Sequence, residues 1–214
     1  MQPKTIENIC LYRITHIENI PHILQYGIVH RTSSNFNNRF ISIGDKSLIN
    51  FRSSKSVTVG NSRIVLGDYI PFYFGVRMPM LYVIQLGGNF VDKARKAEDI
   101  VYIAVSLKNI VDTHHDYYFS DGHATDALTM FYDSCSTDQL PNIIDWGAVT
   151  CHTWSGDGVP TDIKRRKQAE FLVKGDVSPD AIVGFACYND IAKAKLISYG
   201  VDESKIKIVP SAYY

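Results

Sequence analysis

The sequence lacks the short motifs that mark the commonest nucleotide-dependent enzymes and hydrolases. No GxGxxG follows an expected strand, and neither GxxxxGK[ST] nor GxSxG occurs in the 214 residues. Each of those motifs brings backbone amides or a nucleophile to the reacting group through a tight turn. Rossmann, P-loop and α/β-hydrolase chemistry are therefore poor interpretations, and the chemistry must come from polar residues dispersed along the chain.

Cysteine is scarce and widely spaced. The four cysteines form no CxxC pair, and no histidine lies at metal-ligand spacing from them; they are Cys10, Cys135, Cys151 and Cys187. Neither a disulfide framework nor a bound metal is expected. The first residues contain no signal sequence, and no apolar run reaches the length of a membrane span. We therefore expect a cytoplasmic protein with reduced thiols, no metal and no membrane contact.

Net charge is absent as well, since 22 Lys and Arg balance 22 Asp and Glu. The cations are nevertheless clustered. Residues 31–55 contain five of them against Asp45 alone, and residues 164–167 are all cationic. Two basic patches in a neutral chain are typical of a surface that tracks a polyanion, although ordinary solvated faces show the same pattern.

The pattern of strands and helices is mixed, without a regular βαβ rhythm, which favours an α+β fold. We expect strands over 9–15, 67–74, 99–107, 180–188 and 205–209, and helices over 18–26, 45–51, 124–132 and 190–199. Pro71 indicates that 67–74 lies at a sheet edge or a bulge. Residues 53–62 are expected to be irregular. With 45% hydrophobic residues, residues 1–214 should form a single domain.

Residues 162–173 carry the densest chemistry, because four cations precede Gln168-Ala169-Glu170 and an apolar run follows. In a strand, Gln168 and Glu170 would share one face. A carboxylate at the mouth of a sheet beside a basic run suits an enzyme of anionic substrates, and the alternative is a strand-edge Glu paired with a lysine. His16 is expected at a strand-to-helix junction, where it either meets an anion or caps the helix.

Several short motifs between Tyr12 and the terminal Tyr214 resemble motifs of the DarT family of DNA ADP-ribosyltransferase toxins. The most specific are Gly67-Asp68-Tyr69-Ile70-Pro71-Phe72-Tyr73-Phe74, Ser120-Asp121-Gly122-His123-Ala124 and Gln168-Ala169-Glu170. The resemblance implies the ADP-ribosyltransferase fold, a split mixed β-sheet with peripheral helices around an NAD cleft. It implies a toxin that transfers ADP-ribose from NAD⁺ to a thymine or guanine base of single-stranded DNA, releases nicotinamide and blocks replication.

The resemblance also assigns roles to residues. The implied catalytic residues are Glu170, Arg52 and His123, with Glu170 closing a substrate-recognising loop of about 123–170. Arg52 would contact NAD⁺ and help to deprotonate the base. The implied NAD⁺-binding residues are Arg13, Ile14, Thr15, His16, His22, His30 and Arg52, and the NAD-binding element would span about 39–57.

The implied partners are single-stranded DNA and an antitoxin of the DarG type, a macrodomain ADP-ribosyl glycohydrolase. A single strand is favoured physically because base pairing hides the acceptor edge of the base. Two alternatives stay open. The first is an ADP-ribosyltransferase that modifies protein. The second is a non-enzymatic binder of single-stranded nucleic acid, which would leave Glu170 and His123 unexplained.

Overall fold

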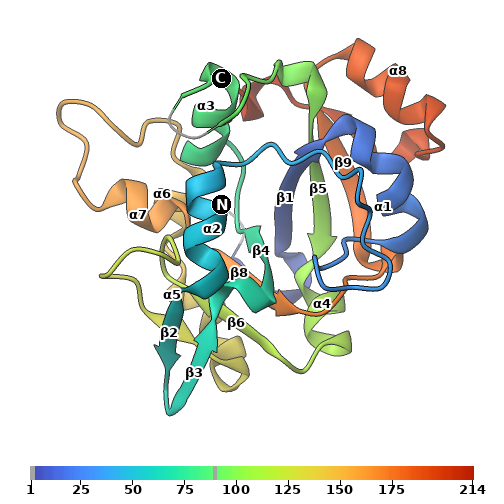
Figure 1. Ribbon diagram of the computed structural model, residues 1–214. Helices are drawn as coiled ribbons and strands as arrows, with labels where there is room; N and C mark the ends of the chain where they lie inside the picture. The colour runs from blue at the N-terminus through green and yellow to red at the C-terminus, as the bar shows by residue number, and fades with distance from the viewer. Residues whose placement is uncertain (1–2, 89–90) are drawn as a thin grey trace.

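The computed structural model describes residues 3–88 and 91–214, and its centre is an eight-stranded sheet (Figure 1). The strand order is β10-β9-β5-β1-β4-β8-β6-β7. The strands are β1 (Cys10–His16), β4 (Tyr69–Tyr73), β5 (Ile100–Ser106), β6 (Tyr117–Ser120), β7 (Phe131–Tyr132), β8 (Glu170–Lys174), β9 (Ile182–Cys187) and β10 (Ile206–Ile208). The β9–β10 pair is parallel and the other pairs are antiparallel. The expected α+β class with a mixed sheet is confirmed.

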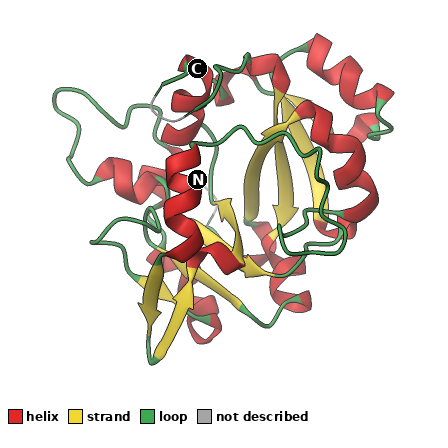
Figure 2. Cartoon of the chain, viewed as in Figure 1, coloured by secondary structure: helices red, strands yellow, loops and turns green. Residues whose placement is uncertain are grey.

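The sheet divides between β1 and β4. Strand β1 pairs with β5 at seven consecutive positions but meets β4 at a single one, Tyr12 with Tyr73. Figure 2 shows the strands diverging into two groups at this point. The Arg13 side chain donates from Nη1 to the Pro71 carbonyl across the opening, at 2.8 Å. The sheet is thus split, and side chains can enter between its halves.

Pro71 lies in an interior strand and pairs with Leu172 without a register shift, so neither the sheet edge nor the bulge that the sequence indicated is found there. The carbonyl of Pro71 faces the split, as its bond from Arg13 shows. In an extended residue the backbone nitrogen points to the same side as the carbonyl oxygen. The N–H that proline lacks would therefore face the opening, where no ladder partner waits for it. The proline costs the sheet no hydrogen bond at this position.

The α-helices lie around the sheet, with α1 and α8 towards β9 and with α2 and α3 at the other end in Figure 1. The α-helices of the described residues are α1 (Ile20–Tyr26), α2 (Lys46–Ser54), α3 (Pro79–Leu86), α4 (Leu107–Thr113), α5 (Leu140–Ile143), α6 (Trp146–Thr150), α7 (Ile163–Lys167) and α8 (Asp190–Ser198). Short 3₁₀ turns cover Ile6–Asn8, Ile17–Asn19, Leu66–Asp68, Ala97–Asp99, Ser134–Gln139, Pro179–Ala181, Glu203–Lys205 and Pro210–Ala212. Within the described ranges no helix has the length and apolarity needed to cross a membrane.

Two segments differ from the sequence-based expectation, and a third had no expected structure. Residues 56–65 form a hairpin, β2 (Ser56–Val59) with β3 (Ser62–Val65), rather than an irregular loop. Residues 124–130 form a loop before β7 rather than a helix, because side chains from outside the segment bind its backbone. Residues 163–167 are helical, since Asp162 forms ion pairs with Arg165 and Arg166, three and four residues later.

The core holds the two strands that carry the site. In the register of β4 with β8, Phe72 lies opposite Phe171, and both side chains are buried in the main hydrophobic cluster. The next register pair along is Tyr73 with Glu170. The packing of the two phenylalanines therefore fixes the positions of these two polar residues at the open end of the sheet.

Candidate active site

Glu170 is the first residue of β8, and its side chain is 1% exposed. Its carboxylate accepts a hydrogen bond from the backbone N–H of Ala124 at 2.9 Å, through Oε1. Its own backbone N–H donates to Ser120 Oγ at 3.2 Å. We had expected Gln168 and Glu170 to share one face of a strand. They do not, because Gln168 ends α7 and β8 begins only at Glu170. The carboxylate is held rigidly at the end of β8.

The partner of this carboxylate is Arg52, 118 residues earlier in the chain. The guanidinium forms a double contact, Nη1 to Oε1 at 3.0 Å and Nη2 to Oε2 at 2.8 Å. Burial alone lowers the pKa of Arg52, but the charge and hydrogen bonds of Glu170 outweigh it, and the pKa ends above its ordinary value. Arg52 is therefore a permanent cation. The alternative of a surface Glu paired with a lysine is wrong.

Arg52 reaches this position from α2. Asp45 begins the helix by accepting a hydrogen bond from the N–H of Leu48 at 3.1 Å. Gly67 lets the helix lie against the turn before β4, since a Cβ there would come within 2.6 Å of Ser53 Cα. The close approach of this helix and turn places the Arg52 side chain over the end of β8.

Arg13 and Tyr73 complete the polar floor of the split. Burial lowers the pKa of Arg13 to about 10, so its guanidinium remains charged near neutral pH. Burial raises the pKa of Tyr73, and the negative charge of Glu170 raises it further, so the phenol stays protonated. Tyr73 has no role in the sequence-based expectation, because its place opposite Glu170 depends on strand pairing between distant segments.

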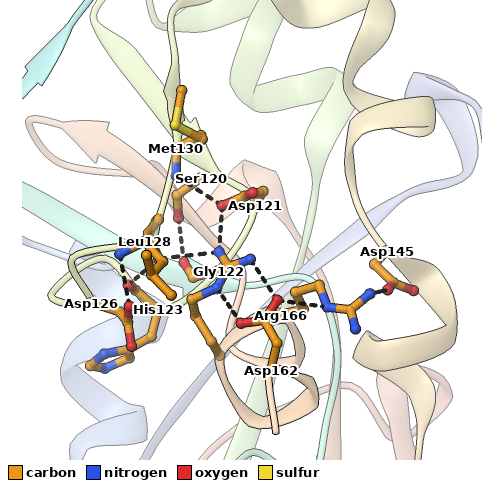
Figure 3. A network of polar contacts seen from close by, with 12 residues as sticks. Ser120, Asp121, Gly122, His123, Asp126, Leu128, Met130, Asp145, Asp162 and Arg166 are labelled. Carbon is orange, nitrogen blue, oxygen red and sulfur yellow. Dashed lines mark hydrogen bonds and ion pairs between the residues drawn. The ribbon is translucent and has the colours of Figure 1, made fainter. Parts of the chain in front are cut away.

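His123 follows the Asp121-Gly122 turn, and its backbone N–H donates to the Arg165 carbonyl at 3.0 Å. Its Nδ1 lies 2.8 Å from Thr125 Oγ1. Figure 3 shows its imidazole projecting away from the polar network around Asp121. Burial lowers the pKa of His123; the charge of Glu170 opposes this shift and that of Arg52 adds to it. The imidazole is therefore neutral near pH 7.

Two adjoining cavities follow the split. The first, about 180 Å³, is lined by Glu170, His123, Tyr73 and Ile14. The second, about 330 Å³, lies further towards α1 and is lined by His22 and His30. Residues that line both cavities are Arg13, Thr15, Phe40, Ser42, Ile49, Arg52 and Pro71. The shared lining residues, Arg52 and Arg13 among them, make the two cavities adjoining parts of one site.

A third, open groove of about 970 Å³ meets the first cavity at His123, Asp45, Leu48 and Met80. Its walls come from α2, α3 and the loop 121–131, and Trp154 and Lys164 also line it. The Trp154 indole is held by a hydrogen bond from Nε1 to Tyr214 Oη at 2.6 Å. A long ligand in the groove would reach the carboxylate of Glu170 past His123.

The structure places all but one of the expected NAD⁺-binding residues in the walls of the two cavities. Six of the seven line the two cavities: Arg13, Ile14, Thr15, His22, His30 and Arg52. His16 does not line either cavity; it is 8% exposed, and its Nδ1 accepts a hydrogen bond from the N–H of Glu18 at 3.2 Å. His16 therefore caps the 3₁₀ turn Ile17–Asn19, one of the two roles expected for it, and its contact with NAD⁺ stays a prediction.

Asn19 is a residue that the sequence reasoning missed. Its side chain donates to the Ile41 carbonyl and accepts from the Ile41 N–H, both at 2.9 Å. Nδ2 also donates to Thr15 Oγ1 at 3.0 Å. Asn19 thereby holds the segment around Ile41 against β1. A buried Asn beside a helix start was the available signal, but its partner lies 22 residues away.

The basic run 164–167 is not a free cationic surface, contrary to expectation. Lys167 is 1% exposed and donates to the carbonyls of Val149 and Cys151 at 3.1 and 2.7 Å. Arg165 and Arg166 form ion pairs with aspartates. Lys164 remains exposed and faces the groove. Most of this run holds neighbouring segments of the chain in place, around Asp121, Asp145 and Val149.

Comparison with known proteins gives a match over nearly the whole chain. The family model described as ssDNA thymidine ADP-ribosyltransferase, DarT, matches residues 12–214. The chain belongs to the DarT family. The DNA ADP-ribosyl transferase of Escherichia coli is 33% identical over 187 residues, covering 87% of this chain and 83% of that protein. The resemblance inferred from the sequence is confirmed.

Solved DarT structures share the fold. Thermus sp. 2.9 DarT in complex with ADP-ribosylated ssDNA superposes with a TM-score of 0.83 at 25% identity, over all of both chains. The same enzyme in complex with NAD⁺ gives a TM-score of 0.77, also at 25% identity, over 97% of this chain and 98% of that one. The expected ADP-ribosyltransferase fold is confirmed.

A fusion protein is also similar. A DNA ADP-ribosyl transferase–DNA ADP-ribosyl glycohydrolase fusion protein of Thermosipho africanus is 29% identical over 206 residues, which are 94% of this chain and 47% of the fusion. The chain therefore matches about half of that fusion's length. Among the described residues of this chain, no group of three or more His, Cys, Asp or Glu side chains is placed to hold a metal.

Proposed function

We propose that this protein transfers ADP-ribose from NAD⁺ to a thymine base of single-stranded DNA and releases nicotinamide. The observation that carries the proposal is the buried carboxylate of Glu170, which Arg52 and the Ala124 N–H fix in the first cavity, where that cavity meets the open groove. Membership of the DarT family supports the reaction class and both substrates. Thymine follows the family description, and guanine is the alternative base.

NAD⁺ fits the two cavities along the split. The donors there are cationic and uncharged groups, as a pyrophosphate and two riboses require, and they include Arg13, Thr15, His22 and His30. We propose that the nicotinamide end lies in the cavity beside Tyr73 and Glu170, with the adenosine end towards His30. The segment 39–57, which lines both cavities, is the proposed NAD-binding element.

The reaction breaks the bond between nicotinamide and ribose C1′, and the electron pair leaves with nicotinamide. Positive charge then develops at the ribose, and the Glu170 carboxylate is placed to stabilise that charge in a site largely closed to water. The base nitrogen forms the new bond to C1′ and must lose its proton. Glu170 is thus the residue on which bond cleavage depends.

The proton acceptor is proposed to be His123. Its neutral imidazole lines both the groove and the first cavity, between the two substrates. Arg52 is unsuited to that task, because Glu170 raises its pKa and keeps it protonated. We propose that Arg52 instead stabilises the negative charge that develops on the base.

The groove is proposed to hold the single strand, and residues 123–170, which form much of its wall, are the proposed substrate-recognising loop within a single domain of residues 1–214. Lys164 would meet a phosphate, and the fixed indole of Trp154 would stack a base. We also propose a cytoplasmic location, where NAD⁺ and DNA are both present, and a toxin role. The fusion relative supports a separate or fused glycohydrolase antitoxin that removes the ADP-ribose.

The test is incubation with NAD⁺ and oligonucleotides of defined sequence. We expect nicotinamide release, one ADP-ribose added to a thymine of the single strand, and little reaction with the same sequence as duplex. Mass spectrometry of digested DNA identifies the modified base, and a protein extract in parallel tests the protein-modifying alternative. Equal rates on duplex and single strand would contradict the proposed acceptor chemistry.

A further inference from the structure

The loop of residues 121–131 presents apolar side chains to solvent beside the active site. Leu128 is 74% exposed and Met130 59% exposed. Leu128 is the most exposed of the large apolar side chains in residues 3–88 and 91–214. A single exposed leucine on a surface needs no explanation. This one is notable because its loop is fixed and because it lines the groove that leads to His123.

The tip of the loop is held by its own polar side chains. The N–H of Leu128 donates to Asp126 Oδ1 at 2.9 Å, and the N–H of Asp126 donates to the His123 carbonyl at 2.9 Å. Thr129 adds a bond from Oγ1 to the same carbonyl at 2.8 Å. The tip is thus an ordered turn, and Figure 3 shows Leu128 beside Asp126 and His123 within it.

The base of the loop is clamped to α7. Asp121 Oδ1 accepts from the N–H of Met130 at 2.9 Å and from Arg165 Nη1 at 2.8 Å, so one carboxylate joins the two ends of the loop to the helix. Asp162 holds the other side of the same guanidinium. A Cβ at Gly122 would lie 2.5 Å from Arg165 Nη1 and 2.8 Å from its Cγ, so a larger residue there would displace the Arg165 side chain.

This loop is also bonded to Glu170 through the Ala124 N–H, at 2.9 Å. Ala124 lies four residues before Leu128. The position of the loop that carries Leu128 is therefore fixed relative to the Glu170 carboxylate. Trp154 and Lys164 line the same groove, and they are the aromatic and cationic groups suited to a nucleic-acid strand.

A base in single-stranded DNA stacks on its neighbours, and the acceptor base must leave that stack to enter the cavity beside Glu170. Enzymes that act on bases bear this unstacking cost. Proteins that separate stacked bases often insert an apolar side chain such as leucine into the gap. An apolar side chain there replaces the lost contact area of the remaining base.

We propose that Leu128 is a positioning residue that packs against the base next to the acceptor, in the space that the acceptor leaves. The proposal rests on the proposed function, because it assumes single-stranded DNA as substrate. Its effect is on the cost of unstacking and not on NAD⁺ binding or on the chemistry at C1′.

The test compares Leu128→Ala with wild type on two oligonucleotides. On an ordinary strand, kcat/KM should fall about tenfold, which corresponds to about 1.4 kcal/mol, because the apolar contact with the neighbouring base is lost. On a strand whose nucleotides flanking the acceptor are abasic, no stack has to be broken. The kcat/KM of Leu128→Ala and that of wild type should then agree within about twofold. The KM for NAD⁺ should be unchanged.

Ile191→Ala is the matched control, because Ile191 is 68% exposed and lies on α8, away from the groove in Figure 1. It should behave as wild type on both strands. Equal rates of Leu128→Ala and wild type on the ordinary strand would overturn the inference, and so would the same loss on the abasic strand. Failure of wild type to modify any DNA would instead refute the proposed function.

Discussion

The Arg52–Glu170 pair should couple activity to stability. The two side chains are 13% and 1% exposed and make two contacts, of 3.0 and 2.8 Å. Alanine at either position leaves the other charge poorly solvated, which typically costs about 3–5 kcal/mol for a fully buried pair. Because Arg52 also lines a cavity, its charge is less completely buried, and we expect a cost of about 2–3 kcal/mol, below that range. For a chain of this length the melting temperature should fall by roughly 4–12 °C.

The assay is a double-mutant cycle with Arg52→Ala, Glu170→Ala and both changes together. Neither charge is left alone in the double variant, so its stability should be no lower than that of the less stable single variant. All three variants should lose at least about 100-fold in transfer rate, since each removes a charge that acts in the transition state. Thermal and denaturant unfolding give the stabilities, and nicotinamide release gives the rate.

Two outcomes would refute this reasoning. One is a double variant whose loss of stability equals the sum of the two single losses, which would mean that the charges do not interact. The other is a Glu170→Ala protein that melts at the wild-type temperature. Lys193→Ala is the control, because its ion pair with Glu203 lies at the surface, with Glu203 67% exposed. That change should barely move the melting temperature.

Three further outcomes are expected. Because the pKa of His123 is lowered, the acid limb of the rate against pH should lie below the ordinary histidine value of about 6.5, and a limb above that value would exclude His123 as the proton acceptor. Lys164→Ala should reduce the slope of log affinity for DNA against log salt by about 0.7, whereas Lys167→Met should leave that slope unchanged because Lys167 is buried; fluorescence anisotropy at several salt concentrations separates the two. Asn19→Ala should raise the KM for NAD⁺ several-fold with little change in the rate at saturation, since it frees the segment around Ile41, and an unchanged KM would contradict that role.

The sequence was sufficient where structure is local. Strands with continuous apolar runs, such as 100–106, and the helix that begins at Asp45 follow from patterns of a few residues. The residues themselves suggested a functional carboxylate at Glu170 but left a strand-edge ion pair open, and the family resemblance gave Arg52 as a contact of NAD⁺, not as the partner of Glu170. Arg52 and Glu170 are 118 residues apart, and no spacing rule joins them.

The misassigned segments are those where distant contacts decide. Residues 124–130 have helical spacing, but the Glu170 carboxylate and Asp121 bind their backbone in a loop. Lys167 belongs to a cationic run, yet only the carbonyls of Val149 and Cys151 explain its burial. A sequence pattern indicates the conformation and burial that a residue prefers locally. For these residues, conformation and burial are determined by partners that are distant in the sequence.

The split between β1 and β4 makes the molecule mechanically uneven. The two halves of the sheet share one backbone register pair, Tyr12 with Tyr73, and the Arg13 bond to Pro71. A sheet resists deformation through the hydrogen bonds between its strands. Because few such bonds join β1 and β4, the two halves of the sheet should separate more easily there than between other strand pairs. A dinucleotide seated along the split would act as a strut between the halves. Binding of the substrate would then restrain the relative motion of the two halves of the sheet, which the backbone hydrogen bonds alone restrain only weakly.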